Sequence, residues 1–492
     1  LFGMGYNIYA VFLLISTAGI PVAIAKQVSK YNALGQEETS YHLLRKILKL
    51  TSILGLIFAA IMYLGSPLLA AWSGGGEDLV RVMKSLSWAL LIFPSMSVLR
   101  GFFQGFNNLK PYAMSQIAEQ IIRVIWMLLT AYIIMNIGSG DYVNAVVQST
   151  FAAFIGMIAS VLVLVVFLWR EGKWQAIFAG NTNDVTVDTQ ALILETIKEA
   201  IPFIITGAAI QLFQIVDQMS FINTMTSFTS YSNKDLQILY AFLSSNPNKI
   251  TMILVSIATA IAGAGIPLLT ENFVNKDKKA AAQLVVNNLQ MLWMVLFPAL
   301  VGAIILAEPI YTLFYGAPSN TALWLFVGAL IQVIFLALYS LLAPMLQALF
   351  EPRKAILYFV YGLVVKIVLQ IPFIYVFQAY GPLISTALGL AVPIVLMYRR
   401  IHEVTGFNRQ GLRRSILLMT LLALIMGVVV AIAAYGLHFA ISPTTRLGSV
   451  VYIALVGAIG VLVYGFLTLA THLLDKLIGT RAKTLRQKLH LP

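Results

Sequence analysis

The chain has 492 residues, of which 60% are apolar and only 10% are charged, and its mean hydropathy is +0.87. Soluble domains carry about 25% charged residues, so this composition excludes a compact water-soluble globule and indicates a polytopic membrane protein. The absence of cysteine excludes disulfide and thiolate chemistry. The net charge of +13 does not indicate nucleic-acid binding, because lysine and arginine concentrate in the cytoplasmic loops of membrane proteins.

Thirteen apolar segments are long enough to cross a bilayer, which takes about 20 helical residues. The segments are too long for barrel strands and lack strand alternation, so we predict an all-α polytopic membrane protein. In chain order they are residues 5–25, 47–72, 85–106, 114–137, 143–168, 200–226, 249–271, 282–307, 320–345, 355–379, 381–398, 415–438 and 448–473.

The loop charges predict the orientation. If the loop after the first segment lies inside, the inside loops hold 25 lysine and arginine residues and the outside loops hold five. This asymmetry follows the positive-inside rule and predicts a membrane protein with Leu1 outside and a cytoplasmic C-terminus. The basic tail 476–488 is expected on the anionic inner surface. The five outside residues are Arg81, Lys84, Lys234, Lys249 and Arg446.

Two parts of the chain repeat. Ala-Gly-Ile-Pro stands at 18–21 and again at 264–267, at the predicted ends of the first and seventh segments. Residues from Ser97 also align without gaps with residues from Ser340, at an offset of 243. The period is six helices, and an even period preserves orientation. We therefore predict two parallel six-helix lobes with a cavity at the membrane midplane and alternating access.

The repeat also predicts the domain limits. Residues 1–198 form the first lobe with five helices, residues 199–400 form the second lobe with six, and residues 401–492 add two helices and the basic tail. The sixth segment, at 200–226, has no repeat partner in the chain. We expect this partner to precede Leu1, which brings the complete protein to fourteen spans.

Two stretches carry a family resemblance. "RGFFQGFNNLKPYAMSQIAEQIIRV" and "GMGYNIYAVFLLISTAGIPVAIAKQVSKY" resemble the polysaccharide-biosynthesis transporters of Gram-positive bacteria. These include the MurJ-type and stage-V-sporulation-type flippases of the multidrug/oligosaccharidyl-lipid/polysaccharide exporter superfamily. The resemblance covers essentially the whole chain. It implies two MATE-like lobes around a V-shaped cavity and two extra helices that line a groove for a lipid tail. It also implies a place in the bacterial cell membrane and lipid II as the substrate.

The resemblance also implies a cavity lined by basic residues. Lys249 stands eighteen residues before Pro267 and matches a basic residue that opens the corresponding family helix. The family's arginines in its first two helices do not carry over, because segment 5–25 has none and the other helix is absent. Asp217 matches by helix a carboxylate that binds a coupling cation in some members, but segment 355–379 offers no acidic or asparagine partner.

Arg123 lies near the middle of its predicted span, where a charge costs about 2.5–3.5 kcal/mol on insertion scales. Glu119 is one turn earlier on the same helix face. One hypothesis is a structural Glu119–Arg123 pair that stabilises the lobe. The alternative is that Arg123 faces the cavity and binds phosphate, with Glu119 orienting or screening it.

Lys366 is the repeat partner of Arg123 and lies equally deep. We hypothesise that it contacts Asp217 in place of a bound cation; the alternative is an unrelated lysine on a hydrated cavity wall. Lys249, at the edge of its span, is either a cavity residue or a lysine that extends to the interface.

Around Asp217, three glutamines spaced by three and four residues share one helix face. They either bond neighbouring helices or bind the substrate's sugar and peptide groups. The glutamines are Gln211, Gln214 and Gln218.

The sequence contains no P-loop, no metal-ligand spacing and no catalytic constellation, so we predict a transporter without cofactor or metal and expect a monomer. The leading hypothesis is a flippase that moves an undecaprenyl-pyrophosphate-linked precursor, lipid II, to the outer leaflet, driven by the membrane potential or an ion gradient. The alternatives are a flippase for another lipid-linked glycan, such as a capsule or teichoic-type unit, and a cation-coupled multidrug exporter.

Overall fold

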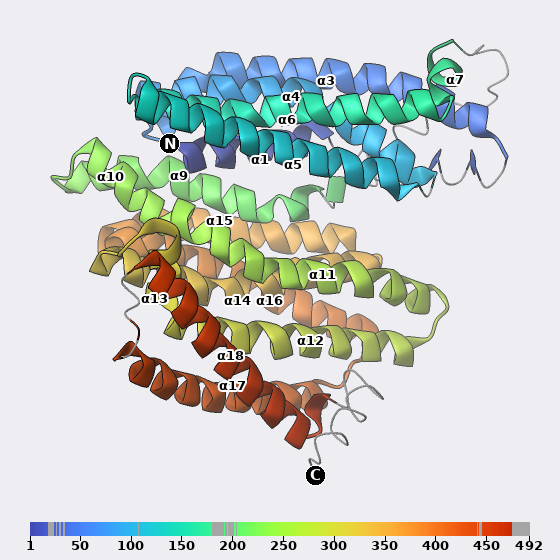
Figure 1. The fold of residues 1–492 in the computed structure, drawn as a ribbon. Coiled ribbons are helices and arrows are strands. Elements are labelled where there is room, and N and C mark those ends of the chain that lie inside the picture. The colour runs from blue at the N-terminus through green and yellow to red at the C-terminus, as the bar shows by residue number, and fades with distance from the viewer. Residues whose placement is uncertain are drawn as a thin grey trace. The chain divides into compact units, whose positions relative to one another are not determined.

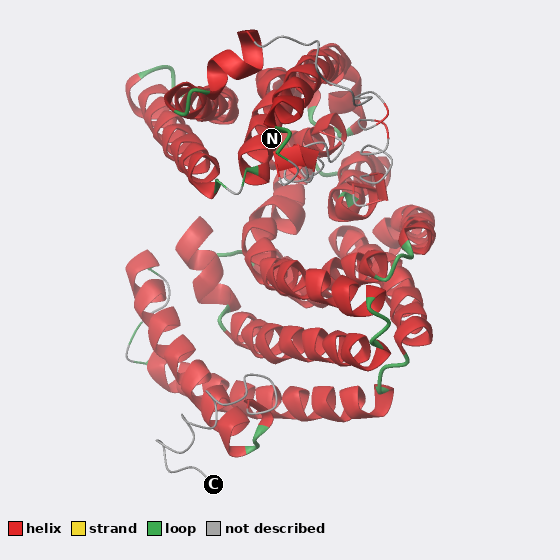
Figure 2. Cartoon of the chain, turned by 90° about the vertical axis from the view of Figure 1, so that its right-hand side faces the viewer, coloured by secondary structure: helices red, strands yellow, loops and turns green. Residues whose placement is uncertain are grey.

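Helices make up all the regular structure of the residues described in this computed structural model (Figure 2). The all-α prediction is therefore confirmed. The first Ala-Gly-Ile-Pro copy, the predicted boundary at 198/199 and the basic tail 476–488 lie outside the described residues. The structure describes residues 1–17, 24–25, 27–28, 31–32, 35–106, 108–179, 191, 194, 201–202, 204–439, 441 and 445–474.

The chain divides into two compact units, and unit 1 comprises Leu1–Asn223. Its long helices α3, α4, α5 and α6 run side by side (Figure 1). α4 occupies the centre, because it packs against α1, α3 and α6. The elements of unit 1 are α1 (Phe2–Thr17), α3 (Glu37–Trp72), α4 (Gly76–Gly105), α5 (Leu109–Tyr132), η1 (Ile133–Ile137), α6 (Tyr142–Arg170), α7 (Lys173–Ala179) and most of α9 (Ala209–Phe228).

Unit 2 comprises Thr224–Pro492. In it, α14 packs against α11 and α16, and α15 packs against α16. The last two helices, α17 and α18, lie against α12 and α13 (Figure 1). The elements are α10 (Asn233–Tyr240), η2 (Ala241–Ser245), α11 (Asn246–Val274), α12 (Lys278–Ile305), α13 (Ala307–Tyr315), α14 (Asn320–Ala348), α15 (Pro352–Phe377), η3 (Gln378–Tyr380), α16 (Gly381–Thr405), α17 (Arg409–His438) and α18 (Arg446–Ala470).

The helix ends reproduce the sequence repeat. α4 ends at Gly105 and α14 at Ala348, while α5 begins at Leu109 and α15 at Pro352. Both pairs are 243 residues apart, the offset of the ungapped alignment. The helix neighbours also match, because α4 packs on α6 as α14 packs on α16, and α5 packs on α6 as α15 packs on α16. Each unit thus contains one copy of the same helix arrangement.

Glycine permits a close helix approach in both copies. A Cβ on Gly156 of α6 would lie 2.7 Å from the carbonyl oxygen of Glu119 in α5. A Cβ on Gly362 of α15 would lie 2.3 Å from the carbonyl oxygen of Gly389 in α16. Both distances are too short for a side-chain carbon, so the α5–α6 and α15–α16 pairs depend on glycine at these contacts.

The second Ala-Gly-Ile-Pro copy does not end its helix, contrary to the sequence prediction. α11 continues from Pro267 to Val274 before the chain turns. Within the copy, Gly265 lies so close to α12 that an added Cβ would meet the Asn288 amide at 2.3 Å. The copy therefore makes a close contact between helices.

Ten continuous helical stretches among the described residues are long and apolar enough to cross a membrane. One of them, Pro352–Thr405, contains both α15 and α16, and the apolar α1 is shorter, with 16 residues. α9 is not among the ten. The structure thus has the helices of a multi-pass membrane protein, and the count of thirteen spans stays a prediction.

Candidate functional site

A buried ion pair joins three helices of unit 1. Arg100 Nη2 of α4 lies 2.7 Å from Glu119 Oε2 of α5 and 2.9 Å from Ser160 Oγ of α6. Arg100 Nε donates to Ser115 Oγ at 3.0 Å. Only 9% of Arg100 and 8% of Glu119 is exposed. Because several hydrogen bonds satisfy the buried charges, the network holds α4, α5 and α6 in one arrangement.

The partner of Glu119 differs from the predicted one. Glu119 pairs with Arg100, and the described residues contain no Glu119–Arg123 ion pair. Glycine at 156 brings α6 close to α5 and places the Cβ of Arg123 against α6. Arg123 is half-buried and has no hydrogen-bond or ion-pair partner in the described part of the chain. The guanidinium near mid-span is therefore not neutralised by Glu119 through a direct contact.

Sequence reasoning missed Arg100. It lies six residues before the end of the predicted span 85–106, so the prediction of orientation assigns its charge to the cytoplasmic loop that follows. A signal was nevertheless present, because Ser115 and Glu119 are four residues apart and share one face of α5. A hydroxyl and a carboxylate on one intramembrane helix face need a hydrogen-bond partner from another helix. Arginine suits this role because it donates several N–H groups.

Lys366 is fully buried between α15 and α16 of unit 2. Its Nζ donates to Thr386 Oγ1 at 2.7 Å, to Ser385 Oγ at 2.9 Å and to the Pro382 carbonyl oxygen at 3.1 Å. Ser385 in turn donates to Gln370 Oε1 at 2.6 Å. The ammonium group thus has three neutral oxygen acceptors inside unit 2, a number that suits its three N–H donors.

Gln218 links α9 to two other helices of unit 1. Its Oε1 accepts from Asn7 Nδ2 at 3.1 Å, and its Nε2 donates to the Met4 carbonyl oxygen at 3.0 Å and to Ser73 Oγ at 3.1 Å. The side chain is fully buried. These contacts favour interhelical bonding for Gln218 over the alternative role in substrate binding.

The other polar residues of α9 differ from Gln218 in burial. Gln211, Gln214 and Asp217 are all half-buried. The Gln211 Oε1 atom is buried and has no hydrogen-bond partner among the described residues. The face around Asp217 therefore keeps some hydrogen-bonding capacity, and its contact with substrate or with a cation stays a prediction.

Lys249 is exposed in the first turn of α11, beside two tyrosines of α13. Its Nζ lies 5.5 Å from the centroid of the Tyr315 ring. Asn246 Nδ2 donates to Tyr311 Oη, and Tyr315 Oη donates to the Asn246 carbonyl oxygen, both at 2.9 Å. These bonds fix the start of α11 and keep the ammonium group over an aromatic face.

The predicted site residues lie in both units. Arg123, Glu119 and the polar face of α9 belong to unit 1, whereas Lys249 and Lys366 belong to unit 2. A cavity shared by these groups, and the contact between Lys366 and Asp217, stay predictions.

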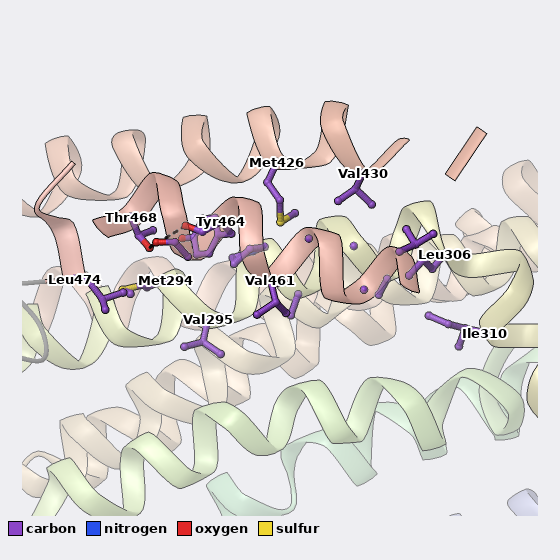
Figure 3. A pocket seen from close by; sticks show the side chains of 18 residues that line it. Met294, Val295, Leu306, Ile310, Met426, Val430, Val461, Tyr464, Thr468 and Leu474 are labelled. Carbon is purple, nitrogen blue, oxygen red and sulfur yellow. Dashed lines mark hydrogen bonds between the residues drawn. The ribbon is translucent and has the colours of Figure 1, made fainter. Parts of the chain in front are cut away.

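An apolar groove of about 550 Å³ lies within unit 2, between α12 and α13 on one side and α17 and α18 on the other (Figure 3). Tyr464 and Thr468 are its only polar residues among those described, and the Thr468 hydroxyl donates to the Tyr464 carbonyl oxygen. The lining residues are Met294, Val295, Pro298, Ala299, Gly302, Ala303, Leu306, Ile310, Met426, Val430, Val456, Gly457, Gly460, Val461, Tyr464, Gly465, Thr468 and Leu474.

The last two helices are attached to α12 by specific contacts. Trp293 Nε1 of α12 donates to Thr420 Oγ1 of α17 at 2.9 Å. A Cβ on Gly427 of α17 would lie 2.6 Å from Val301 Cγ1 of α12, so the two helices touch closely there. A buried cluster around Val430 and Val456 joins α17 to α18. The groove is therefore bounded by packed helices.

Sequence comparison shows that this chain is similar to a known protein family and to individual bacterial proteins. Residues 1–273 match the family model described as polysaccharide biosynthesis protein. The lipid II flippase MurJ of Bacillus subtilis (strain 168) is 33% identical over 98% of this chain and 90% of its own length. Stage V sporulation protein B of the same organism is 31% identical over 30% of this chain and 28% of its own length.

Solved structures show the same fold. A lipid II flippase MurJ in an inward closed conformation matches with a TM-score of 0.64 and 15% identity, over 95% of this chain and 93% of its own. An inward-facing multidrug resistance MATE transporter of the MOP superfamily also matches with a TM-score of 0.64, at 16% identity, over 82% of this chain and 90% of its own.

Proposed function

The chain belongs to the polysaccharide biosynthesis protein family, in its MurJ-type branch, and from this premise we propose that it is a lipid II flippase. It moves the undecaprenyl-pyrophosphate-linked cell-wall precursor from the inner to the outer leaflet by alternating access of its two lobes. It acts as a transporter and not as an enzyme. Its C-terminus lies in the cytoplasm, as the distribution of lysine and arginine predicts.

The apolar groove of unit 2 carries this proposal. A polyprenyl tail is a hydrocarbon chain, and an apolar groove keeps it in apolar surroundings while the head group crosses the membrane. The groove offers this tail an almost wholly apolar path between α12 and α18. A soluble cationic drug has no long hydrocarbon chain to place in this groove. The groove therefore favours a lipid-linked substrate over the multidrug-exporter alternative.

The head group of lipid II requires cations, because its pyrophosphate carries negative charge through a low-dielectric region. Arg123 is suited to this role, since it is half-buried and has no ion-pair partner among the described residues. Lys249 is also available, because its described contact is an aromatic ring and not a carboxylate. We assign phosphate binding to these two residues, and a structural role to Glu119 and Gln218.

Complementation tests the proposal. In cells depleted of their lipid II flippase, the wild-type chain is expected to restore growth, whereas Arg123→Ala and Lys249→Ala are expected to fail at equal membrane levels. Lys234→Ala serves as the matched control, because it removes an exposed lysine of α10. Rescue by both alanine variants would remove the two residues from the site. A properly inserted wild-type chain that does not rescue would favour a flippase for another lipid-linked glycan.

The driving force gives a second expected result. Moving one charge across the membrane is worth about 2.3 kcal/mol per 100 mV, so an inside-negative potential favours outward movement of an anionic head group. Depolarising energised vesicles is therefore expected to slow flipping by the reconstituted chain. An unchanged rate in depolarised, sodium-free vesicles with equal pH on both sides would contradict a role for the potential.

A further inference from the structure

A second, smaller hollow lies in unit 1, whereas the apolar groove described above lies in unit 2. It has a volume of about 250 Å³ and is formed by α3, α4 and α6. Two cationic side chains and three aromatic rings meet there, with a glutamine amide and a serine hydroxyl. The lining residues are Tyr63, Arg81, Lys84, Ser85, Trp88, Val147, Gln148 and Phe151.

The cations of this hollow are held in place by neutral groups. Lys84 Nζ lies 5.1 Å from the centroid of the Tyr63 ring. An Arg81 guanidinium N–H donates to Asn144 Oδ1 of α6. Neither cation forms an ion pair among the described residues, and the Gln148 amide makes no hydrogen bond to them. Two positive charges and a free amide thus face one small space.

The neighbouring carboxylates do not neutralise these charges. Glu77 and Asp78, in the first turn of α4, form no ion pair with either cation in the described part of the chain. Asp141 is used as the N-cap of α6, where its Oδ1 accepts from the backbone N–H groups of Val143 and Asn144. Among the described residues, no carboxylate forms an ion pair with either cation that lines the hollow, so both cations can contact an added anion.

The depth of the hollow matches the level of lipid head groups. α4 has 30 residues and is about 45 Å long, close to the full thickness of a bilayer, about 40–45 Å with its head groups. Lys84 stands eight residues after the start of α4, which places its Cα about 12 Å from that end. Side chains on a helix tilt toward its N-terminus, so both cations point back toward the head-group layer.

The walls of the hollow are partly open. Trp88 is 49% exposed and Tyr63 is 41% exposed, and both lie in helices that are long and apolar enough to span a membrane. Tryptophan and tyrosine favour the membrane interface, where one edge is apolar and the other is wet. The hollow is smaller than the roughly 300–1,000 Å³ of sites for drug-sized ligands, so it suits a phosphate and its glycerol better than a disaccharide.

We propose that this hollow binds the phosphate head group of an anionic membrane phospholipid in the outer leaflet. Arg81 and Lys84 contact the phosphate, Gln148 donates its amide to a phosphate or glycerol oxygen, and Tyr63 and Trp88 flank the glycerol and upper acyl chains. At the offset of 243, the positions of the two cations correspond in unit 2 to Trp324 and Val327, which carry no charge, so the site belongs to unit 1 alone. It is independent of the transported substrate.

Native mass spectrometry of the purified full chain tests this assignment, with phosphatidylglycerol as the probe and phosphatidylcholine as the neutral comparison. The Arg81→Gln/Lys84→Gln double variant is expected to bind phosphatidylglycerol about 25-fold more weakly, because each cation near a lipid surface contributes about fivefold. Lys234→Gln/Arg446→Gln removes the same charge from exposed positions outside the hollow and is expected to bind as the wild type does.

Three results would overturn the assignment. The first is unchanged phosphatidylglycerol binding by the pocket variant, and the second is an equal loss in the control variant, which indicates general surface attraction. The third is displacement of the lipid by excess inorganic phosphate or preferential binding of undecaprenyl pyrophosphate, which assigns the hollow to a free anion or to substrate. Gln148→Leu keeps both charges and is expected to weaken binding modestly, which gives a second readout if the double variant does not fold.

Discussion

Replacing Gly457 with phenylalanine is expected to reduce lipid II flipping by about tenfold or more while the fold stays intact. Gly457 lines the apolar groove, and an added Cβ meets no heavy atom within 4 Å. The Cβ of the new side chain therefore has open space, and its ring takes up part of the groove that Gly457 lines. Each lost packing contact between tail and groove atoms costs about 0.1–0.2 kcal/mol, so the loss of about ten contacts accounts for a tenfold reduction. The measurement is the initial flipping rate per protein molecule in reconstituted vesicles.

Gly436 provides the matched control. It lies in α17, has equally open space around its Cα and does not line the groove. Gly436→Phe is expected to flip lipid II at the wild-type rate, and both variants are expected to have wild-type melting temperatures. Normal transport by Gly457→Phe, or an equal loss in Gly436→Phe, would show that the tail does not use the groove.

Replacing Glu119 with glutamine is expected to lower the free energy of unfolding by about 3–5 kcal/mol, because the Arg100 guanidinium then stays buried without a counter-charge. Equilibrium unfolding of the purified chain in detergent measures the change. Arg123→Gln is expected to change the free energy of unfolding far less, since Arg123 has no ion-pair partner among the described residues. The two substitutions therefore separate the observed pair from the pair predicted by sequence.

Two further variants control this experiment. Glu77→Gln removes an exposed carboxylate and is expected to change the free energy of unfolding by no more than about 0.5 kcal/mol. The Arg100→Leu/Glu119→Leu double variant is expected to recover most of the stability lost in Glu119→Gln, because no unpaired charge remains buried. If Glu119→Gln unfolds like Glu77→Gln, the ion pair does not hold the three helices together.

The helix pattern was predictable because its cause is local. Apolar length decides which segments cross a membrane, and the ungapped repeat predicted matching helices at an offset of 243 residues. The ends of α4 and α14 and the starts of α5 and α15 agree with that offset. The predicted end of a helix at Pro267 was wrong, because the helix continues to Val274. Gly265 in that motif instead allows a close contact with α12.

The pairing of polar groups was predictable only in part. The deep positions of Arg123 and Lys366 were predicted from their place in apolar segments, whereas the partners of Glu119 and Lys366 were not. Glu119 bonds Arg100, nineteen residues away on another helix, and Lys366 bonds hydroxyls of α16. Glu119 and Arg123 share a helix face by spacing alone, and spacing within one helix does not reveal which side chain a neighbouring helix brings closer.

The sequence by itself determined the class of this protein: an apolar, positively biased chain with two copies of one helix pattern and a few intramembrane charges. Only the tertiary structure decided which polar groups are already satisfied, as at Glu119 and Gln218, and where α17 and α18 leave an apolar groove. The physical reason is that hydropathy and repeats act along the chain, whereas ion pairs and grooves form between helices distant in sequence, and close contacts such as Gly156 with α5 and Gly427 with α12 set those distances.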